Sequence, residues 1–136
     1  MSGTVSTTGK ELDPNGVHHP KHYNVHPSGV ETIEVIRHLP YDLGAAFKYV
    51  VRWREKDGKK DLEKALWYLA DLKSHPFITY SSSYAGSVIL NVRKYRDTAT
   101  DEAEALFYDA VLGYMSGSGA AVERMIAQVK NLLEKA

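Results

Sequence analysis

Several features are missing from this 136-residue sequence, and each absence excludes a class of protein. There is no cysteine, which excludes disulfide scaffolds, thiolate nucleophiles and cysteine-ligated zinc sites. No apolar run approaches the ~20 residues that span a bilayer. Residues 1–10 are rich in serine and threonine and lack the apolar segment of a secretory signal. We therefore expect a soluble, intracellular protein with no membrane partner.

An excess of charge of either sign is also missing, because 17 basic residues balance 17 acidic ones. A protein that coats duplex nucleic acid usually carries a basic surplus, since its affinity comes from neutralised phosphates. The balance argues against an extended nucleic acid as partner and leaves room for a local phosphate pocket. Apolar residues at 43% and charged residues at 25% are typical of a globular domain with one core.

Two familiar catalytic motifs are absent as well. The sequence has no Gly-x-x-x-x-Gly-Lys-Ser/Thr phosphate loop, and the glycine-rich residues 116–119 lack the lysine that such a loop needs. It has no Gly-x-Ser-x-Gly nucleophile elbow either. Any phosphate chemistry must therefore use other groups.

Hydrophobic spacing predicts a mainly α fold. Residues 1–16 are expected to form a flexible N-terminal arm, and residues 17–75 a small helical domain. Ser28 with Glu31 three residues later has the spacing of a capping box and predicts a short helix that Pro40 ends. A second helix is expected over residues 41–56, with a buried stripe of Leu43, Phe47, Val50 and Val51.

A third helix is expected to begin at Lys60 or Asp61 and to end before Pro76. Gly58 is predicted to cap the preceding helix in a left-handed conformation. Because the connection is short, the second and third helices should form an antiparallel hairpin.

Residues 76–136 are expected to form a helical C-terminal extension packed on the same core. Residues 77–96 suit one helix, although residues 77–80 and 88–92 could instead pair as strands; the helix is preferred. Thr100 is expected to cap a helix over residues 101–115. A last helix over residues 120–135 would bury Val122, Met125, Ile126, Val129 and Leu133.

The second helix carries a basic stripe. Lys48, Arg52 and Lys56 follow one another at four-residue spacing, which places them on one helix face. Arg52 could bind a phosphate with two hydrogen bonds while Lys48 acts as a point charge. The alternative is a solvated face on which Glu55, Asp57 and Glu63 are the ionic partners.

Aromatic residues alternate with these charges. Trp53 and Trp67 are expected in the core, because large aromatics dominate core energetics. Tyr49 and Tyr68 adjoin polar positions, so they are candidates for stacking on a base or for a hydroxyl contact.

A loop before the first helix contains His18, His19, His22 and His26. Four-residue spacing suits a metal site only on a helix, and Pro20 and Pro27 prevent a continuous helix there. We therefore expect no transition metal. The imidazoles are better suited to donate hydrogen bonds to a phosphate or to the hairpin.

Four motifs occur in order along the chain: His19-Pro20-Lys21-His22-Tyr23, then Val30-Glu31-Thr32-Ile33-Glu34-Val35-Ile36, then Gly44 through Lys48-Tyr49 and Arg52, and finally Asp61-Leu62-Glu63-Lys64-Ala65-Leu66-Trp67-Tyr68-Leu69. Over about residues 17–72 this string resembles a family of small bacteriophage proteins of unknown function. The best-known relative in that family is the nucleotide kinase of the T-odd coliphages.

The resemblance implies a helical nucleotide-binding domain in the cytoplasm of an infected host cell. It further implies a kinase without a P-loop, which uses ATP, with Mg²⁺ possible, to phosphorylate deoxynucleoside monophosphates. The catalytic candidates are Lys48, Arg52 and Asp61. The nucleotide- or phosphate-binding candidates are His19, His22, Tyr23, Tyr49, Lys59, Lys64 and Tyr68.

The chain departs from the family pattern at two places. Ala45 stands where the family often has asparagine, and the usual Arg-Ala-Gly-Lys-Lys run is altered between Arg52 and Lys60. The alternative reading is thus a non-catalytic accessory protein that sequesters nucleotides or signalling nucleotides, or that binds a host protein. A small helical domain with this many aromatics is also expected to form a homo-oligomer.

Overall fold

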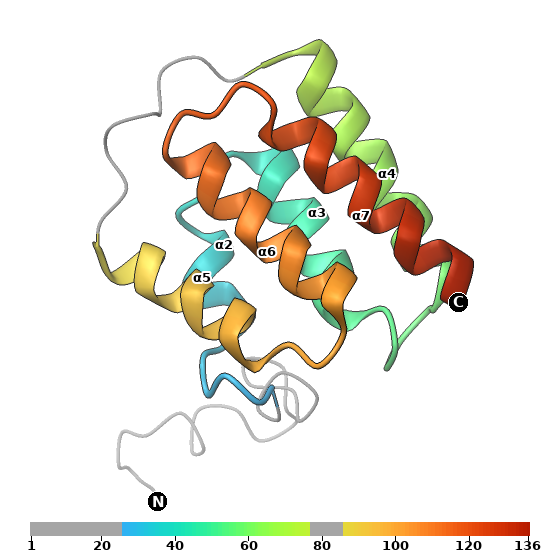
Figure 1. Cartoon of the computed structure of the whole chain (residues 1–136), viewed down its shortest axis with the longest axis horizontal. Helices are drawn as coiled ribbons and strands as arrows, with labels where there is room; N and C mark the ends of the chain where they lie inside the picture. Colours follow the sequence, from blue (N-terminus) through green and yellow to red (C-terminus); the bar gives the residue numbers. More distant parts are fainter. Residues whose placement is uncertain (1–25, 77–85) are drawn as a thin grey trace, which may run out of the picture.

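The computed structural model describes residues 26–76 and 86–136, and the structural statements below concern these residues. They form six α-helices and no strand, which confirms the expected mainly α fold (Figure 1). The helices are α2 (Thr32–Ile36), α3 (Tyr41–Arg52), α4 (Lys59–Ser74), α5 (Gly86–Thr98), α6 (Glu102–Met115) and α7 (Ala121–Lys135).

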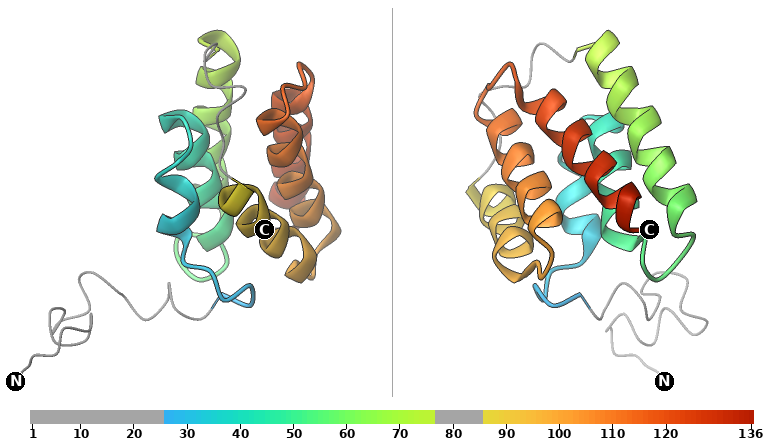
Figure 2. Two further views of the ribbon diagram at one scale, coloured as in Figure 1. Left: turned by 90° about the vertical axis from the view of Figure 1, so that its left-hand side faces the viewer. Right: turned by 45° about the vertical axis from the view of Figure 1, so that its right-hand side comes forward.

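The helices are arranged in two layers. Figure 2 shows α2, α3 and α4 on one side and α6 and α7 on the other, with α5 across one end. The hairpin predicted from the sequence is present, since α3 and α4 pack against each other as antiparallel neighbours. The layers are joined where α4 packs on α7, and α5 contacts both α6 and α2.

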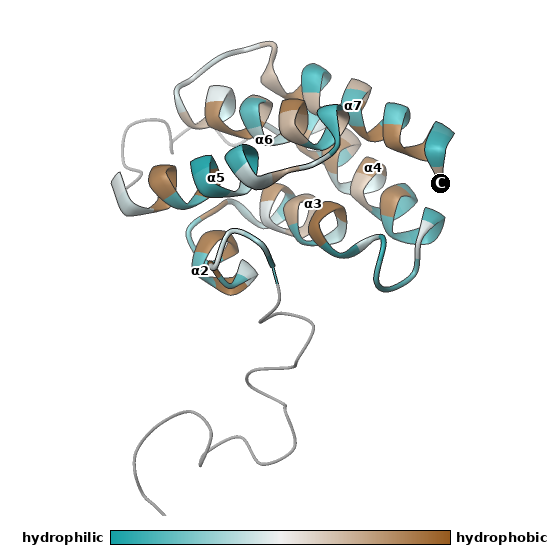
Figure 3. Cartoon of the chain, turned by 60° about the horizontal axis from the view of Figure 1, so that its bottom comes forward, coloured by the Kyte–Doolittle hydropathy of each residue, from teal (hydrophilic) through white to brown (hydrophobic). Residues whose placement is uncertain are grey.

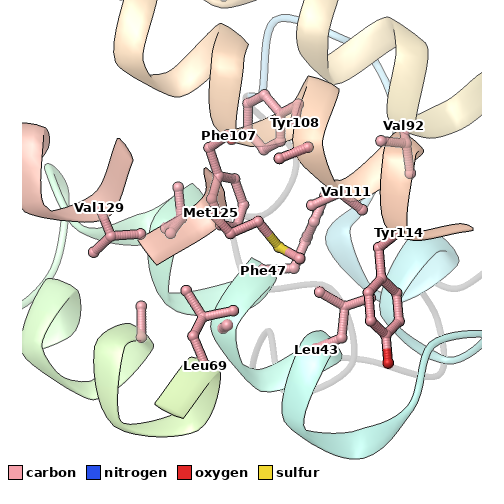
Figure 4. Close-up of a cluster of buried hydrophobic side chains, with 14 of the residues drawn as sticks. Leu43, Phe47, Leu69, Val92, Phe107, Tyr108, Val111, Tyr114, Met125 and Val129 are labelled. Atoms are coloured by element: carbon pink, nitrogen blue, oxygen red, sulfur yellow. The ribbon is translucent and has the colours of Figure 1, made fainter. Parts of the chain in front are cut away.

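The core lies between the layers. In Figure 3 the hydrophobic faces of the helices turn toward one another and the hydrophilic faces turn outward. The fully buried Phe47 of α3 lies beside Phe107 and Tyr108 of α6 (Figure 4), and Tyr95 of α5 also contacts it. Its ring centroid is 5.2 Å from that of Tyr95, 5.4 Å from that of Tyr108 and 6.5 Å from that of Phe107. The predicted hairpin thus shares its core with the helices of residues 86–136.

The start of α2 differs from the prediction. Glu31, not Ser28, is the N-cap residue, and its capping box is with Glu34. The hydroxyl of Ser28 instead lies 2.8 Å from Nδ1 of His26 and accepts from the backbone N–H of Val30. Residues 26–29 thus form a tight turn before the helix. Gly29 has a positive φ of 77°, which is not a helical conformation, so a helix cannot begin at Ser28.

Helix α3 is shorter than predicted. It ends at Arg52, and residues 53–58 form turns rather than another helical turn ending at Lys56. Gly58 has a positive φ of 56°, but with ψ of −125° it is the N-cap residue of α4 and not the predicted left-handed cap of α3, whose C-cap is Trp53. The N–H of Gly58 donates to the carbonyl of Trp53. This geometry reverses the chain within six residues and leads directly into α4.

The C-terminal helices follow the prediction with two corrections. Residues 88–92 lie within α5, so the strand alternative is wrong there, while residues 77–80 lie outside the described residues. The N-cap of α6 is Asp101 rather than Thr100, because the Asp101 carboxylate accepts hydrogen bonds from the N–H groups of Ala103 and Glu104.

Burial confirms the predicted core at Leu43, Phe47, Val50, Met125 and Val129, whereas Val51, Val122 and Ile126, which were also expected there, are only partly buried. Trp53 is 7% exposed as expected, whereas Trp67 is 63% exposed. In α7 the fully buried leucine is Leu132, and Leu133 packs only partly against the core. Trp67 lies off the apolar stripe of α4, so its hydrophobicity alone does not bring it inside. Within the described residues, no helix is long and apolar enough to cross a membrane.

Candidate functional site

Helix α3 presents a short cationic face near its C-terminal end. Lys48 and Arg52 are one turn apart and both are half-buried. Lys56, the third residue of the predicted stripe, lies exposed in the turn that follows α3. The stripe therefore consists of two residues on the helix, not three.

A buried carboxylate holds Arg52 in place. Asp61 of α4 is fully buried, and its Oδ2 and Oδ1 accept from Nε and Nη2 of Arg52, each at 3.1 Å. Oδ2 also accepts from the backbone N–H of Asp57, and the Asp57 carboxylate lies 3.6 Å from Nη2. The Nε–Nη2 edge of the guanidinium is thus hydrogen-bonded to Asp61, and the remaining N–H groups of Arg52 make no hydrogen bond to this carboxylate.

Arg52 stays charged in this setting. Burial alone would lower its pKa, but the hydrogen bonds and negative charge of Asp61 outweigh that effect, so the pKa is raised above its ordinary value. Arginine held this way is a cation with a fixed orientation, which suits recognition of a phosphate.

Three cations surround the ring of Tyr49. Nζ of Lys48 lies 4.7 Å from the ring centroid, Cζ of Arg52 lies 4.9 Å from it, and Nζ of Lys64 lies 5.3 Å from it. Cation–π attraction offsets part of the repulsion between these charges. In the part of the chain that the structure describes, neither Lys48 nor Lys64 forms an ion pair. The face therefore presents two uncompensated positive charges.

Aromatic rings continue this face along α4. The rings of Tyr49 and Tyr68 stack with centroids 6.0 Å apart, and Tyr68 makes edge contacts with Tyr41 and Trp67. A hydrogen bond with Tyr41 is the main cause that raises the pKa of Tyr68, so the Tyr68 hydroxyl remains protonated at neutral pH. Tyr41 is 76% exposed, which leaves an aromatic surface open to solvent.

A cavity of about 250 Å³ lies on the other side of Lys48 and Arg52. Its wall is formed by residues from the turn before α2, from α3 and the turn after it, and from the α5–α6 connection: His26, Pro27, Thr32, Lys48, Val51, Arg52, Arg54, Glu55, Thr98, Ala99, Thr100, Glu104 and Tyr108. Small-molecule sites usually occupy ~300–1,000 Å³, so this cavity is at the lower end of that scale.

The far wall of the cavity is tied to α3 by Glu104. Its carboxylate accepts from Nε1 of Trp53 at 3.0 Å and from Nη1 of Arg54, which also stacks on the Trp53 ring. Arg54 is further paired with the helix-capping residue Asp101 at 3.7 Å. This network positions the first turn of α6 beside the end of α3.

His26 forms the rim of the cavity next to α2. Its ring stacks on Tyr95 with centroids 3.9 Å apart, and Nδ1 accepts from the backbone N–H of Ser28. Nε2 therefore carries the proton of the neutral ring. Burial lowers the pKa of His26, so the residue is a neutral hydrogen-bond donor at pH 7.

The structure brings together most of the predicted site residues that it describes. Lys48, Tyr49, Arg52, Asp61, Lys64 and Tyr68 form one cluster at the α3–α4 hairpin. Lys59 is exposed at the first residue of α4, outside the contacts of this cluster. His19, His22 and Tyr23 lie outside the described residues.

Sequence reasoning missed the C-terminal wall. The only available signal was the four-residue spacing of Glu104 and Tyr108, which places both on one face of α6. Nothing in the sequence indicates that this face meets Arg54, since the two segments are about fifty residues apart. Across the two described stretches, no group of three or more histidine, aspartate or glutamate side chains is arranged to hold a metal ion.

Comparison with known families adds one finding. Residues 17–70 match the model of a family described as a protein of unknown function (DUF3310). No curated protein and no solved structure matches the chain. The match includes α2, α3 and most of α4, and therefore Lys48, Arg52 and Asp61, but not the C-terminal wall of the cavity. Residues 17–70 of this chain are a DUF3310 domain.

Proposed function

We propose that the cavity and the cationic face of α3 bind the phosphate of a nucleotide. The observation that carries the proposal is that Lys48 and Arg52, one turn apart, both line a 250 Å³ cavity while Asp61 holds Arg52 from behind. A preorganised arginine beside a mobile lysine is a common arrangement for phosphate recognition. The resemblance of the four motifs to a phage nucleotide-kinase family supports the same ligand.

The finer proposal is a deoxynucleoside monophosphate kinase without a P-loop. In this reaction a phosphate oxygen of the monophosphate attacks the terminal phosphorus of ATP, and ADP leaves with the electrons of the broken P–O bond. Such catalysis depends mostly on positioning and on neutralising oxygen charge. Lys48 and Arg52 would supply that charge, and Asp61 would act as a positioning residue for Arg52.

The face outside the cavity suits the second nucleotide. Lys64 and Lys48 flank Tyr49 there, so the phosphates of ATP could bind next to those of the monophosphate. Asp61 is fully buried and both its oxygens are engaged, so it offers no ready ligand for Mg²⁺. In this proposal Mg²⁺ arrives with ATP.

Calorimetric titration of the full chain with each deoxynucleoside monophosphate, and with ATP, tests binding. Lys48→Gln should weaken binding by about 10- to 100-fold, because it removes a charge-assisted hydrogen bond worth ~1.5–3 kcal/mol. Lys130→Gln on the exposed face of α7 is the matched control and should leave affinity unchanged. Equal affinity of the two variants would contradict the phosphate site.

Turnover is measured separately, as ADP formed only when ATP and a monophosphate are both present. A folded protein that binds both nucleotides and forms no ADP would refute the kinase while leaving the binding site intact. ADP formed without the monophosphate would indicate ATP hydrolysis instead.

The second candidate function is a non-catalytic accessory protein that sequesters nucleotides or signalling nucleotides, or binds a host protein. The engagement of Asp61 by Arg52 favours it, because it removes the one acid that the sequence nominated for catalysis. Ala45, where related sequences often have a polar side chain, favours it as well. Tight binding without turnover would distinguish this function from the kinase.

We also propose that the chain self-associates. Tyr41 and Trp67 expose 76% and 63% of their surface on the α3–α4 hairpin, which is unusual for side chains of this size. Sedimentation of the wild type against Trp67→Ala tests this, and an unchanged oligomeric state would remove Trp67 from the interface.

A further inference from the structure

A second hollow lies where α5 packs against α6, next to the first turn of α7 (Figure 1). It is an open groove of about 330 Å³, and it shares no lining residue with the cavity beside Lys48 and Arg52. Its lining residues all lie between Ile89 and Arg124, outside the segment that matches the DUF3310 family. The groove is therefore separate from the cavity both in space and along the chain.

Three arginines line the groove, and only one of them has an acidic partner. Arg96 of α5 pairs with Asp97 at 3.0 Å and with Asp109 of α6 at 3.3 Å. Arg93 of α5 and Arg124 of α7 are exposed, and neither forms an ion pair with any residue that the structure describes. Because Asp109 is the only acid in the described lining, the groove has a surplus of two positive charges.

The position of Arg124 depends on a glycine of α6. A Cβ atom at Gly113 would lie 2.6 Å from Nη2 of Arg124, a separation too short for these atoms. The same nitrogen donates to the hydroxyl of Ser118 at 3.4 Å. Arginine binds carboxylates with two parallel hydrogen bonds, so the orientation of its guanidinium matters. The absence of a side chain at Gly113 therefore allows Arg124 to lie against α6 in the groove.

Aliphatic side chains accompany the arginines. Ile89 of α5 and Leu112 of α6 are partly buried, and Met115 is 4% exposed. No aromatic ring is present among the described residues that line the groove. Bases of nucleotides and of single-stranded nucleic acids usually bind by stacking on such rings. A partner with carboxylates and aliphatic side chains therefore matches this groove better than one with phosphates and bases.

The groove already accommodates one carboxylate. Oδ1 of Asp109 accepts a hydrogen bond from Nη1 of Arg96 at 3.3 Å. A carboxylate of a partner would form the same charge-assisted hydrogen bond with Arg93 or Arg124. From Ile89 to Arg96 helix α5 rises by about 10 Å, at ~1.5 Å per residue. An extended peptide covers that distance in about three residues, so a short segment is enough to follow the groove.

We propose that the groove between α5 and α6 docks a short acidic and aliphatic peptide segment of a partner protein, whose carboxylates bind to Arg93 and Arg124. The aliphatic side chains of the segment cover Ile89 and Leu112. This inference does not depend on the proposed nucleotide binding, because the groove and the cavity share no lining residue. Each of the two sites is therefore tested without the other.

The probe is a fluorescein-labelled peptide, Gly-Glu-Leu-Asp-Glu-Leu-Glu-Gly, whose binding to the full chain is measured by fluorescence anisotropy. An analogue with glutamine and asparagine in place of the acids should bind about 10-fold more weakly or worse, because it loses every charge-assisted hydrogen bond. An analogue with serine in place of the two leucines should bind about 3- to 10-fold more weakly, because less apolar surface is buried.

Two double variants locate the binding surface. Arg93→Gln with Arg124→Gln should weaken binding of the acidic peptide by about 5- to 20-fold, since each exposed ion pair contributes about 2- to 5-fold. Lys94→Gln with Lys130→Gln is the matched control, because these exposed lysines of α5 and α7 do not line the groove. This control removes the same charge and should bind like the wild type. Both double variants should bind deoxynucleoside monophosphates as the wild type does.

Two single variants test the geometry. Asp109→Asn should strengthen peptide binding by about 2- to 5-fold, because it frees Arg96 inside the groove. Asp97→Asn removes the partner of Arg96 that lies outside the groove and should strengthen binding less. Gly113→Ala should weaken binding by about 2- to 5-fold by displacing Arg124, although it removes no charge. Its urea midpoint should not fall, because alanine favours a helix more than glycine does.

Several outcomes would overturn the proposal. One is a folded wild type that does not bind the acidic peptide at low salt, and another is equal affinity for the acidic and the amide peptides. A third is equal peptide binding by the arginine double variant and the lysine double variant. If single-stranded oligodeoxythymidylate binds more tightly than the peptide, and through Arg93 and Arg124, the groove is a nucleic-acid site instead. Peptide binding without any nucleotide binding would refute the proposed function and support this inference.

Discussion

The ion pair between Arg52 and Asp61 makes an asymmetric prediction about stability. Asp61 is fully buried, whereas the Arg52 side chain is 21% exposed and has a second partner in Asp57, at 3.6 Å. Removing Arg52 leaves a buried carboxylate with only the Asp57 N–H as donor. Removing Asp61 leaves a cation that can turn toward water and toward Asp57. The two truncations should therefore differ in cost.

Breaking a buried pair by removing one partner typically costs ~3–5 kcal/mol. We expect Arg52→Ala to lower the free energy of unfolding by about 3 kcal/mol, at the low end because one hydrogen bond to Asp61 survives. Asp61→Ala should cost only about 1–2 kcal/mol, since the stranded arginine reaches solvent. Against a typical total of ~5–15 kcal/mol, the difference between the two is readily measurable.

Urea unfolding, followed by far-ultraviolet circular dichroism, measures both costs at pH 7. The double variant should cost less than the two single truncations together, because no charge is left without its partner. Arg96→Ala is the matched control: Arg96 pairs with Asp97 and Asp109, but its side chain is 34% exposed and those of its partners are 64% and 60% exposed. That truncation should cost at most about 1 kcal/mol.

Two results would refute the reasoning. If Arg52→Ala lowers the free energy of unfolding no more than Arg96→Ala does, the burial of Asp61 does not make its ion pair with Arg52 important for stability. If Asp61→Ala lowers the free energy of unfolding more than Arg52→Ala does, contact with solvent does not compensate the unpaired charge of Arg52.

Three further predictions concern the hairpin. Burial, followed by a hydrogen bond and repulsion from Asp71, raises the pKa of Asp42 to about 6. The folded state therefore binds the Asp42 proton more tightly than the unfolded state does, so the free energy of unfolding falls as pH rises from about 4 to 6. Asp42→Asn should remove this pH dependence, as measured by urea unfolding at a series of pH values. At pH 7 the variant should be more stable than the wild type by up to about 1 kcal/mol, since solvent screens the charge. Gly58→Ala should lower the free energy of unfolding by about 1 kcal/mol or more, because φ is 56° at this position and an alanine is strained there. An unchanged midpoint of urea unfolding would contradict this expectation. Trp67→Ala should change the unfolding free energy by less than about 0.5 kcal/mol at low protein concentration, because the side chain is 63% exposed, and a cost above 2 kcal/mol would mean that it is buried in solution.

The boundary of the DUF3310 match does not coincide with a structural boundary. The match ends at residue 70, inside α4, which continues to Ser74. Phe47, within the matched segment, is buried by Tyr95, Phe107 and Tyr108, which lie beyond it. The segment thus depends on the rest of the chain for its core.

Local rules account for what the sequence predicted well. Apolar spacing located the hairpin and its buried residues Leu43 and Phe47, because a helix face repeats every three to four residues. The same rule placed Lys48 and Arg52 one above the other. It failed for the N-caps, where Glu31 and Asp101 replaced the expected Ser28 and Thr100, since several adjacent residues can cap equally well.

The sequence by itself therefore determined the helices, the hairpin and the pairing of Lys48 with Arg52 on one face. Only the tertiary structure decided that Asp61 is buried against Arg52, and that Glu104 and Tyr108 close the cavity from the opposite layer. The first set follows from contacts within a few residues, where helical geometry leaves little choice. The second depends on how two layers pack, and that packing is set by the whole core rather than by any motif.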